Sequence, residues 1–202
     1  MKQLRMFCFL VVASLSAGAM AQAAPANAPA QQQAAKPAPT IASSMDRQVS
    51  IIEREFVGAA EAMPEEKYGF TPTSLNIQGS EYKGVRTFAE EVKHVAATNL
   101  LLWSAVTGDK PAYDLSNDNG PDSIKTKADI LKFLKESFDL GHKAAKSLTA
   151  ENSTATVKTF FGDTPKVFAT SFAVAHGFDH YGQMVEYLRM NGIVPPASRP
   201  QK

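Results

Sequence analysis

The sequence holds a single cysteine, Cys8, within an N-terminal segment that we expect to be removed during export. The mature chain would then lack cysteine, which excludes a disulfide, a thiolate nucleophile, an iron–sulfur cluster and a thiolate-ligated zinc site. An excess of charge is also missing, since 21 Lys and Arg residues stand against 20 Asp and Glu residues, without a basic run or stripe. We therefore expect no nucleic acid partner.

Residues 1–21 have the composition of a secretory signal peptide. Lys2 and Arg5 precede a short apolar run and then small residues, which end in the tripeptide AMA at residues 19–21. A basic start, an apolar centre and small residues before the cleavage point are the three parts of such a signal. The run is too short for a stable membrane span. We predict cleavage close to Ala21, a secreted or periplasmic protein, and no stable membrane span in the mature chain.

Two further segments follow the predicted signal. Residues 22–42 consist mostly of Ala, Pro and Gln with almost no charge. They show no apolar stripe and contain too many prolines for a helix, so we expect a disordered leader. Residues 43–198 are expected to form one domain, because about 155 residues suffice for a single substantial core.

Four amphipathic segments of this domain predict an all-α fold. Their expected bounds are about residues 45–63, 88–107, 127–147 and 165–191. Apolar residues recur every three or four positions in each, and strong strand alternation is absent from the sequence. Thr87 and Glu90 have the spacing of a capping box, and Thr164 followed by Pro165 favours a helix start. Residues 156–161 have a strand-like composition but are too short to be more than a connection. The interpretation is an up-down four-helix bundle with long loops.

Two histidines four residues apart, His176 and His180, are the strongest chemical signal in the chain. One helical turn separates them, so both project from the same side of the last helix and can bind one ion together. On a helical wheel the pair lies away from the polar arc that holds Asp179 and Glu186. Such pairs also occur as two hydrogen-bonded core or interface histidines, so the spacing alone leaves both interpretations open.

Three segments resemble the DinB superfamily and occur in the order typical of that family. They are residues 62–72 (AMPEEKYGFTP), 84–96 (GVRTFAEEVKHVA) and 176–196 (HGFDHYGQMVEYLRMNGIVPP). The resemblance covers roughly residues 43–198. It implies a four-helix bundle that holds a divalent metal with one histidine of the second helix and an HxxxH pair of the last. His94, His176 and His180 are the residues that match these ligands.

Periodicity supports His94 less well than it supports the pair. His94 lies about a third of a turn from the centre of the apolar stripe of its helix, so the sequence pattern alone would not select it. Three neutral imidazoles with an open fourth position suit Zn²⁺, Ni²⁺ or Fe²⁺, whereas a closed structural zinc site needs four protein ligands. An open position allows a metal to polarise a substrate or to lower the pKa of water. The sequence identifies no general base, and catalytic residues stay unassigned.

Two functions of different classes fit these observations. The resemblance implies a metal-dependent enzyme, since characterised members of the family include thiol-dependent transferases and isomerases and suspected hydrolases. Export would separate the chain from thiols that are chiefly cytosolic, which favours hydrolysis of a small molecule. The alternative is a non-catalytic, metal-stabilised bundle that binds a ligand or partner, and a homodimer is compatible with either. A coordination position open to a cavity would indicate the enzyme, and closure by a fourth ligand the binding module.

Four other residues could contribute to a site. Arg86 could meet a substrate anion or only hold its loop, and Glu53 could accept a proton near the metal or lie on a solvated face. His142 matches no ligand of the family and is expected to pack or to lie half exposed. Asn99 lies on the apolar stripe of its helix and needs a hydrogen-bond partner if it is buried.

Overall fold

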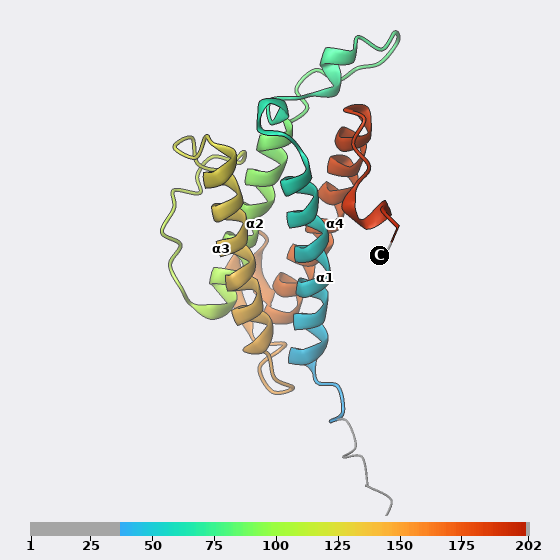
Figure 1. Cartoon of the computed structure of the whole chain (residues 1–202). Helices are drawn as coiled ribbons and strands as arrows, with labels where there is room; N and C mark the ends of the chain where they lie inside the picture. Colours follow the sequence, from blue (N-terminus) through green and yellow to red (C-terminus); the bar gives the residue numbers. More distant parts are fainter. Residues whose placement is uncertain (1–36, 201–202) are drawn as a thin grey trace, which may run out of the picture. The chain divides into compact units, whose positions relative to one another are not determined.

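The computed structural model describes residues 37–200. Its main elements are α1 (Ile41–Ala62), α2 (Phe88–Thr107), α3 (Lys127–Lys146), β1 (Thr156–Thr159), β2 (Gly162–Pro165) and α4 (Lys166–Met190). Figure 1 shows the four long helices packed side by side, as an all-α bundle requires. In the described part of the chain, no helix is both long and apolar enough to span a bilayer. The predicted signal peptide and residues 22–36 of the predicted leader lie outside the described residues.

Local capping signals set the bounds of the helices. α2 begins where predicted, because the Glu90 amide donates to Thr87 Oγ1 and the Glu90 carboxylate accepts from the Thr87 amide. Gly108 ends α2 in the left-handed region at φ 81°, where glycine has no steric penalty. α1 starts earlier than predicted, because Thr40 and Ser43 cap its first turn reciprocally. The last two residues assigned to the leader, Ile41 and Ala42, are therefore helical.

A β-hairpin occupies the segment expected to be only a connection. β1 pairs antiparallel with β2, and Thr159 faces Gly162 across the register. Phe160 and Phe161 are therefore left as a two-residue turn. Because the pairing includes Thr164 and Pro165, α4 begins one residue later than predicted, at Lys166, with Pro165 as its N-cap.

The helix directions correct the predicted up-down order. α2 and α3 run in the same direction, since Asn99 Nδ2 donates to Ser137 Oγ at 3.3 Å and, four residues further along both helices, Trp103 packs on Gly141. The loop of residues 108–126 connects α2 to α3 and runs back along the bundle over the length of one helix, roughly 30 Å. The loop is long enough for this crossover, and helical periodicity carries no information on direction.

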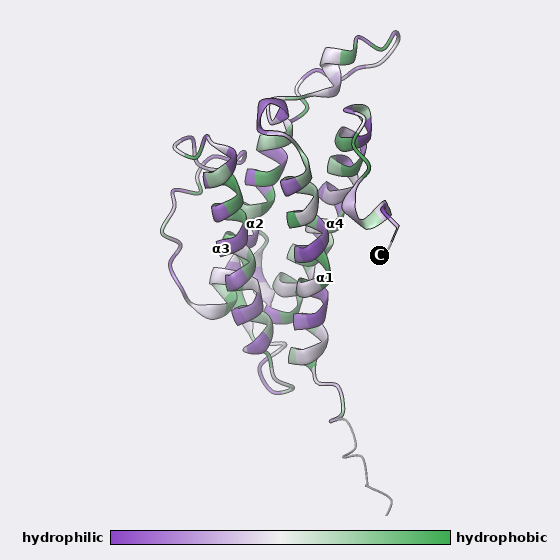
Figure 2. Ribbon diagram, in the orientation of Figure 1, coloured by the Kyte–Doolittle hydropathy of each residue, from purple (hydrophilic) through white to green (hydrophobic). Residues whose placement is uncertain are grey.

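The core lies between helices that are not all consecutive in the sequence. α1 and α2 each pack mainly against α3 and α4. Hydrophilic and hydrophobic residues alternate along α1 and α3, as amphipathic helices require (Figure 2). The largest fully buried side chains include Trp103, Phe56, Phe88, Phe133 and Phe138. Asn99 is also buried, and its bond to Ser137 gives it the structural role that its position on the apolar stripe predicts.

Candidate metal centre

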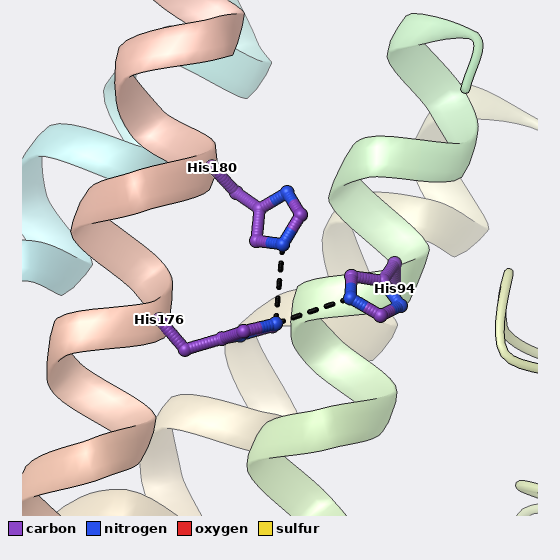
Figure 3. Close-up of side chains that lie close together, drawn as sticks. All are labelled: His94, His176 and His180. Atoms are coloured by element: carbon purple, nitrogen blue, oxygen red, sulfur yellow. Dashed lines mark hydrogen bonds between the residues drawn. The ribbon is translucent and has the colours of Figure 1, made fainter. Parts of the chain in front are cut away.

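Three histidine rings from two helices meet in the groove between α2 and α4. His94 belongs to α2, while His176 and His180 lie one turn apart on α4 (Figure 3). The Nε2 atom of His176 lies 3.1 Å from the Nε2 of His94 and 3.1 Å from the Nε2 of His180. No other His, Cys, Asp or Glu of residues 37–200 joins this group. The structure thus brings together all three histidines that match the family pattern.

Close packing of α4 on α1 accompanies the histidine pair. Gly177, between the two histidines, faces Ile52 of α1, and a Cβ at this position would lie 2.9 Å from Ile52 Cγ1. That separation is too short for carbon atoms without displacement, so glycine permits the close approach of the two helices. The antiparallel neighbour α2 then supplies the third histidine on the other side of the groove.

Hydrogen-bond acceptors hold the outer nitrogens of His180 and His94, which are the Nδ1 atoms that point away from the centre of the group. His180 Nδ1 lies 2.5 Å from Oε2 of Glu91, a buried carboxylate on α2. His94 Nδ1 lies 2.6 Å from the carbonyl oxygen of Asp118. Because both partners are acceptors, each Nδ1 carries the proton, and each Nε2 presents a lone pair to the centre of the group. His176 Nδ1 is buried and has no partner among the described residues.

This arrangement of nitrogens fits a cation. With lone pairs on His94 Nε2 and His180 Nε2, only His176 could place a proton among the three atoms, and one proton cannot satisfy both 3.1 Å contacts well. A metal ion accepts all three lone pairs at once, and metal-bound histidines commonly donate their other ring N–H to a carboxylate or carbonyl. The three-histidine cluster therefore fits a divalent-metal site.

The electrostatics of the site keep the rings of His176 and His94 neutral. Burial lowers the pKa of His176 to about 3, and the nearby His180, His94 and Arg86 act in the same direction. Burial also lowers the pKa of His94, against the opposing effect of its hydrogen bond to Asp118. A neutral imidazole is the form that binds a metal, so these two rings need lose no proton near pH 7.

Arg86 holds the loop that reaches over the site. Its Nε donates to Asn119 Oδ1 at 2.8 Å, and its guanidinium pairs with the carboxylate of Asp118. Of the two interpretations for Arg86, these contacts support the one in which it fixes a loop. The carbonyl of Asp118 is held against His94 as a result.

Sequence reasoning did not identify Glu91 or Asp118. Glu91 lies three residues before His94 on α2, and this spacing on one helix face is the signal that could have pointed to it. Asp118 has no comparable signal, because its contact with His94 depends on how the loop of residues 108–126 folds back.

Glu53 and His142 belong to a different cluster. His142 on α3 bridges to α1, with its Nδ1 2.6 Å from Asp46 Oδ1 and its Nε2 2.9 Å from Glu53 Oε2. Glu53 therefore binds His142 instead of facing only solvent, and it does not belong to the group of three histidines. His142 is half-buried, as predicted, and Asp179 is exposed.

A pocket of about 440 Å³ opens beside the metal centre. His94 and His176 form part of its wall, together with Thr98 of α2 and with residues of the loop and of the β-hairpin. A fourth ligand could therefore approach from this pocket rather than from the protein.

The fold and the histidine cluster define a four-helix bundle whose groove fits a divalent metal. A family model described as the DinB superfamily matches residues 48–184, and the chain belongs to this superfamily. A crystal structure of a DinB-like protein from Bacillus cereus ATCC 10987 is similar, with a TM-score of 0.59 and 15% identity over 78% of this chain and 96% of that chain. At this identity the likeness shows the shared fold. No curated protein matches the sequence.

Proposed function

We propose that this protein binds a divalent transition metal through the Nε2 atoms of His94, His176 and His180 and acts on a small molecule held in the adjoining pocket. The convergence of the three Nε2 atoms, with two outer nitrogens held by acceptors, carries this proposal. Zn²⁺, Ni²⁺ and Fe²⁺ all accept imidazole ligands. When bound, the ion would supply Lewis acidity to polarise a substrate or to lower the pKa of water.

The pocket favours an enzyme over a non-catalytic module. A structural metal site is closed by a fourth protein ligand, and no such ligand joins the three histidines within residues 37–200. His94 and His176 instead face a cavity that a small molecule can enter. We favour hydrolysis over thiol transfer, because an exported protein would not meet cytosolic thiols.

Groups of this protein have three separate tasks in the proposal. Glu91 and the Asp118 carbonyl orient His180 and His94 and keep their Nδ1 atoms protonated. Thr98 lies on the pocket wall one turn beyond His94, where its hydroxyl can donate to a polar group of the substrate. Phe172 stacks on His176 and shields that ring from water.

Metal analysis of protein purified without a histidine tag tests the proposal. We expect about one ion per chain, and a sharp loss of occupancy in each of the variants His94→Ala, His176→Ala and His180→Ala. His142→Ala is the matched control and should retain the metal. Full occupancy in any one of the three ligand variants would contradict the assignment of that residue.

A screen of esters, amides and thiol adducts then tests catalysis. The expected result is turnover of an ester or amide that a chelator abolishes and added metal restores. Metal-loaded protein that turns over none of these, and that a chelator only destabilises, would favour the non-catalytic bundle.

We also propose that the protein is exported, supported by the three-part composition of residues 1–21. N-terminal sequencing of the mature protein should find a start close after Ala21. Recovery of material from the cytosol that begins at Met1 would contradict export.

A further inference from the structure

The pocket beside the metal centre has a polar end and an apolar end. Along α2, Thr98 follows His94 by one helical turn and Leu101 by two turns, and all three line the pocket. Leu101 is thus displaced from His94 by roughly 10 Å along the helix axis. α4 runs antiparallel to α2, so Phe172, one turn before His176, lines the wall opposite. The pocket therefore extends from the histidines along the groove toward the β-hairpin.

Stacked aromatic rings connect the metal centre to the tip of the hairpin. Phe172 lies 6.1 Å from His176 between ring centroids, with nearly parallel planes, and Phe161 packs edge-on to Phe172 at 4.8 Å. Phe160 lies 4.4 Å from Phe161. These two turn residues are 58% and 47% exposed. Because a contiguous exposed aromatic cluster is unfavourable in water, its position on the rim of a pocket indicates a binding surface.

The charge of the wall selects against anions. No Lys or Arg of the described residues lines this pocket, and its acidic side chain is that of Asp118. Arg86 is engaged by Asp118 and Asn119 and is not part of the wall. An anionic group in the apolar part of the pocket would lose its hydration, would find no cation, and would meet a carboxylate.

We propose that the pocket binds an uncharged small molecule that carries an aryl or alkyl group. The apolar group lies among Leu101, Phe161 and Phe172, and the polar group that reacts lies at His94 and His176. The volume of about 440 Å³ is sufficient for two linked or fused rings. The assignment of the reacting group rests on the proposed function, whereas binding of the apolar group needs no metal.

Two probes with the same ring system test the inference. N-Phenyl-1-naphthylamine is uncharged, and 8-anilino-1-naphthalenesulfonate adds one sulfonate. Fluorescence titration of the full mature chain, metal-free and metal-loaded, should show binding of the uncharged probe in both states. In the metal-free protein the sulfonated probe should bind at least about tenfold more weakly, since its charge is desolvated without a partner.

Substitutions on the wall locate the probe. Phe161→Ala and Leu101→Ala should each weaken binding of the uncharged probe by about five- to tenfold, through lost aromatic and apolar contact. Both side chains are partly exposed, so neither change empties the core. Phe178→Ala is the matched control, because Phe178 is 40% exposed on α4 and does not line the pocket. The affinity of the Phe178→Ala variant for the uncharged probe should equal that of the wild type.

Three results would overturn the inference. They are equal affinity of the metal-free protein for the two probes, wild-type affinity in both wall variants, and a change of oligomeric state in Phe161→Ala without loss of probe binding. The last would assign the exposed rings to an interface between copies of the chain. The metal proposal fails separately: if metal analysis finds no ion while the uncharged probe binds as expected, the metal function is wrong and the apolar site stands.

Discussion

The Nδ1 atom of His180 lies 2.5 Å from Oε2 of Glu91, whose side chain is 2% exposed between α2 and α4. A carboxylate in this position fixes the tautomer and the orientation of the ring and increases the basicity of its Nε2. Glu91 therefore acts on the metal centre through His180 and is a positioning residue.

Removal of this carboxylate should weaken metal binding. We expect Glu91→Ala to lower metal affinity by roughly 10- to 100-fold, because His180 loses the acceptor that holds it. Glu91→Gln keeps an acceptor oxygen and should lose less. Competition with a chromogenic chelator measures both, with the exposed Asp179→Asn as control. Wild-type affinity in Glu91→Ala would show that His180 needs no orienting partner.

Metal binding should tolerate mild acid. The pKa of His176 is lowered to about 3 and that of His94 is also lowered, so protons compete with metal at these two rings only below the ordinary range near 6.5. Affinity should therefore fall less steeply from pH 7.5 to pH 6 than it would with free imidazoles at all three positions. A helical peptide with the same HxxxH spacing should lose metal steadily through about pH 6.5. If the protein follows the peptide, the buried neutral state of the rings is wrong.

His142 should make stability decrease at alkaline pH. Burial alone would lower its pKa, but hydrogen bonds to Glu53 and Asp46 and the charges of these carboxylates outweigh burial and raise the pKa. Lys146, 3.6 Å from Asp46, is another cation near this cluster. Because the folded-state pKa exceeds the unfolded value, the stabilisation is complete below about pH 6.5 and is lost as pH rises through the folded-state pKa.

Urea unfolding of wild type and His142→Gln at pH 6 and pH 9 measures this effect. We expect the free energy of unfolding of the wild type to exceed that of His142→Gln by about 1 kcal/mol at pH 6 and by less at pH 9. The value at pH 6 already allows for the partial exposure of the His142 side chain. A difference that does not depend on pH would mean that the charge of His142 does not contribute.

Gly141 and Gly182 should respond oppositely to alanine. A Cβ at Gly141 would lie 2.6 Å from Cζ3 of the buried Trp103, so Gly141→Ala should destabilise the protein by about 1–3 kcal/mol. A Cβ at Gly182 on α4 would meet no atom within 4 Å, so Gly182→Ala should stabilise by about 0.5–1 kcal/mol through helix propensity. Thermal unfolding of both variants provides the comparison, and equal shifts would contradict the close packing of α2 on α3.

Features encoded by neighbouring residues could be predicted from the sequence. The capping box of Thr87 and Glu90 and the left-handed Gly108 define both ends of α2, because capping involves residues within one turn. The shared orientation of His176 and His180 follows from helical geometry alone. The hairpin could not be predicted in the same way, because strand pairing joins two segments and neither is strand-like enough by itself.

Contacts between segments distant in the sequence were decided by the tertiary structure. A period of 3.6 residues defines which face of a helix is apolar but not its neighbour or its direction, so the parallel course of α2 and α3 could not be inferred. His94 was selected by family resemblance, and only packing of α2 on α4 brings its Nε2 to the pair. The contacts of Glu91 and Asp118 with the histidines, and the pocket itself, likewise form only when the loop and the helices pack together. The sequence thus determined the helices and the paired histidines, and tertiary packing determined the site that they form.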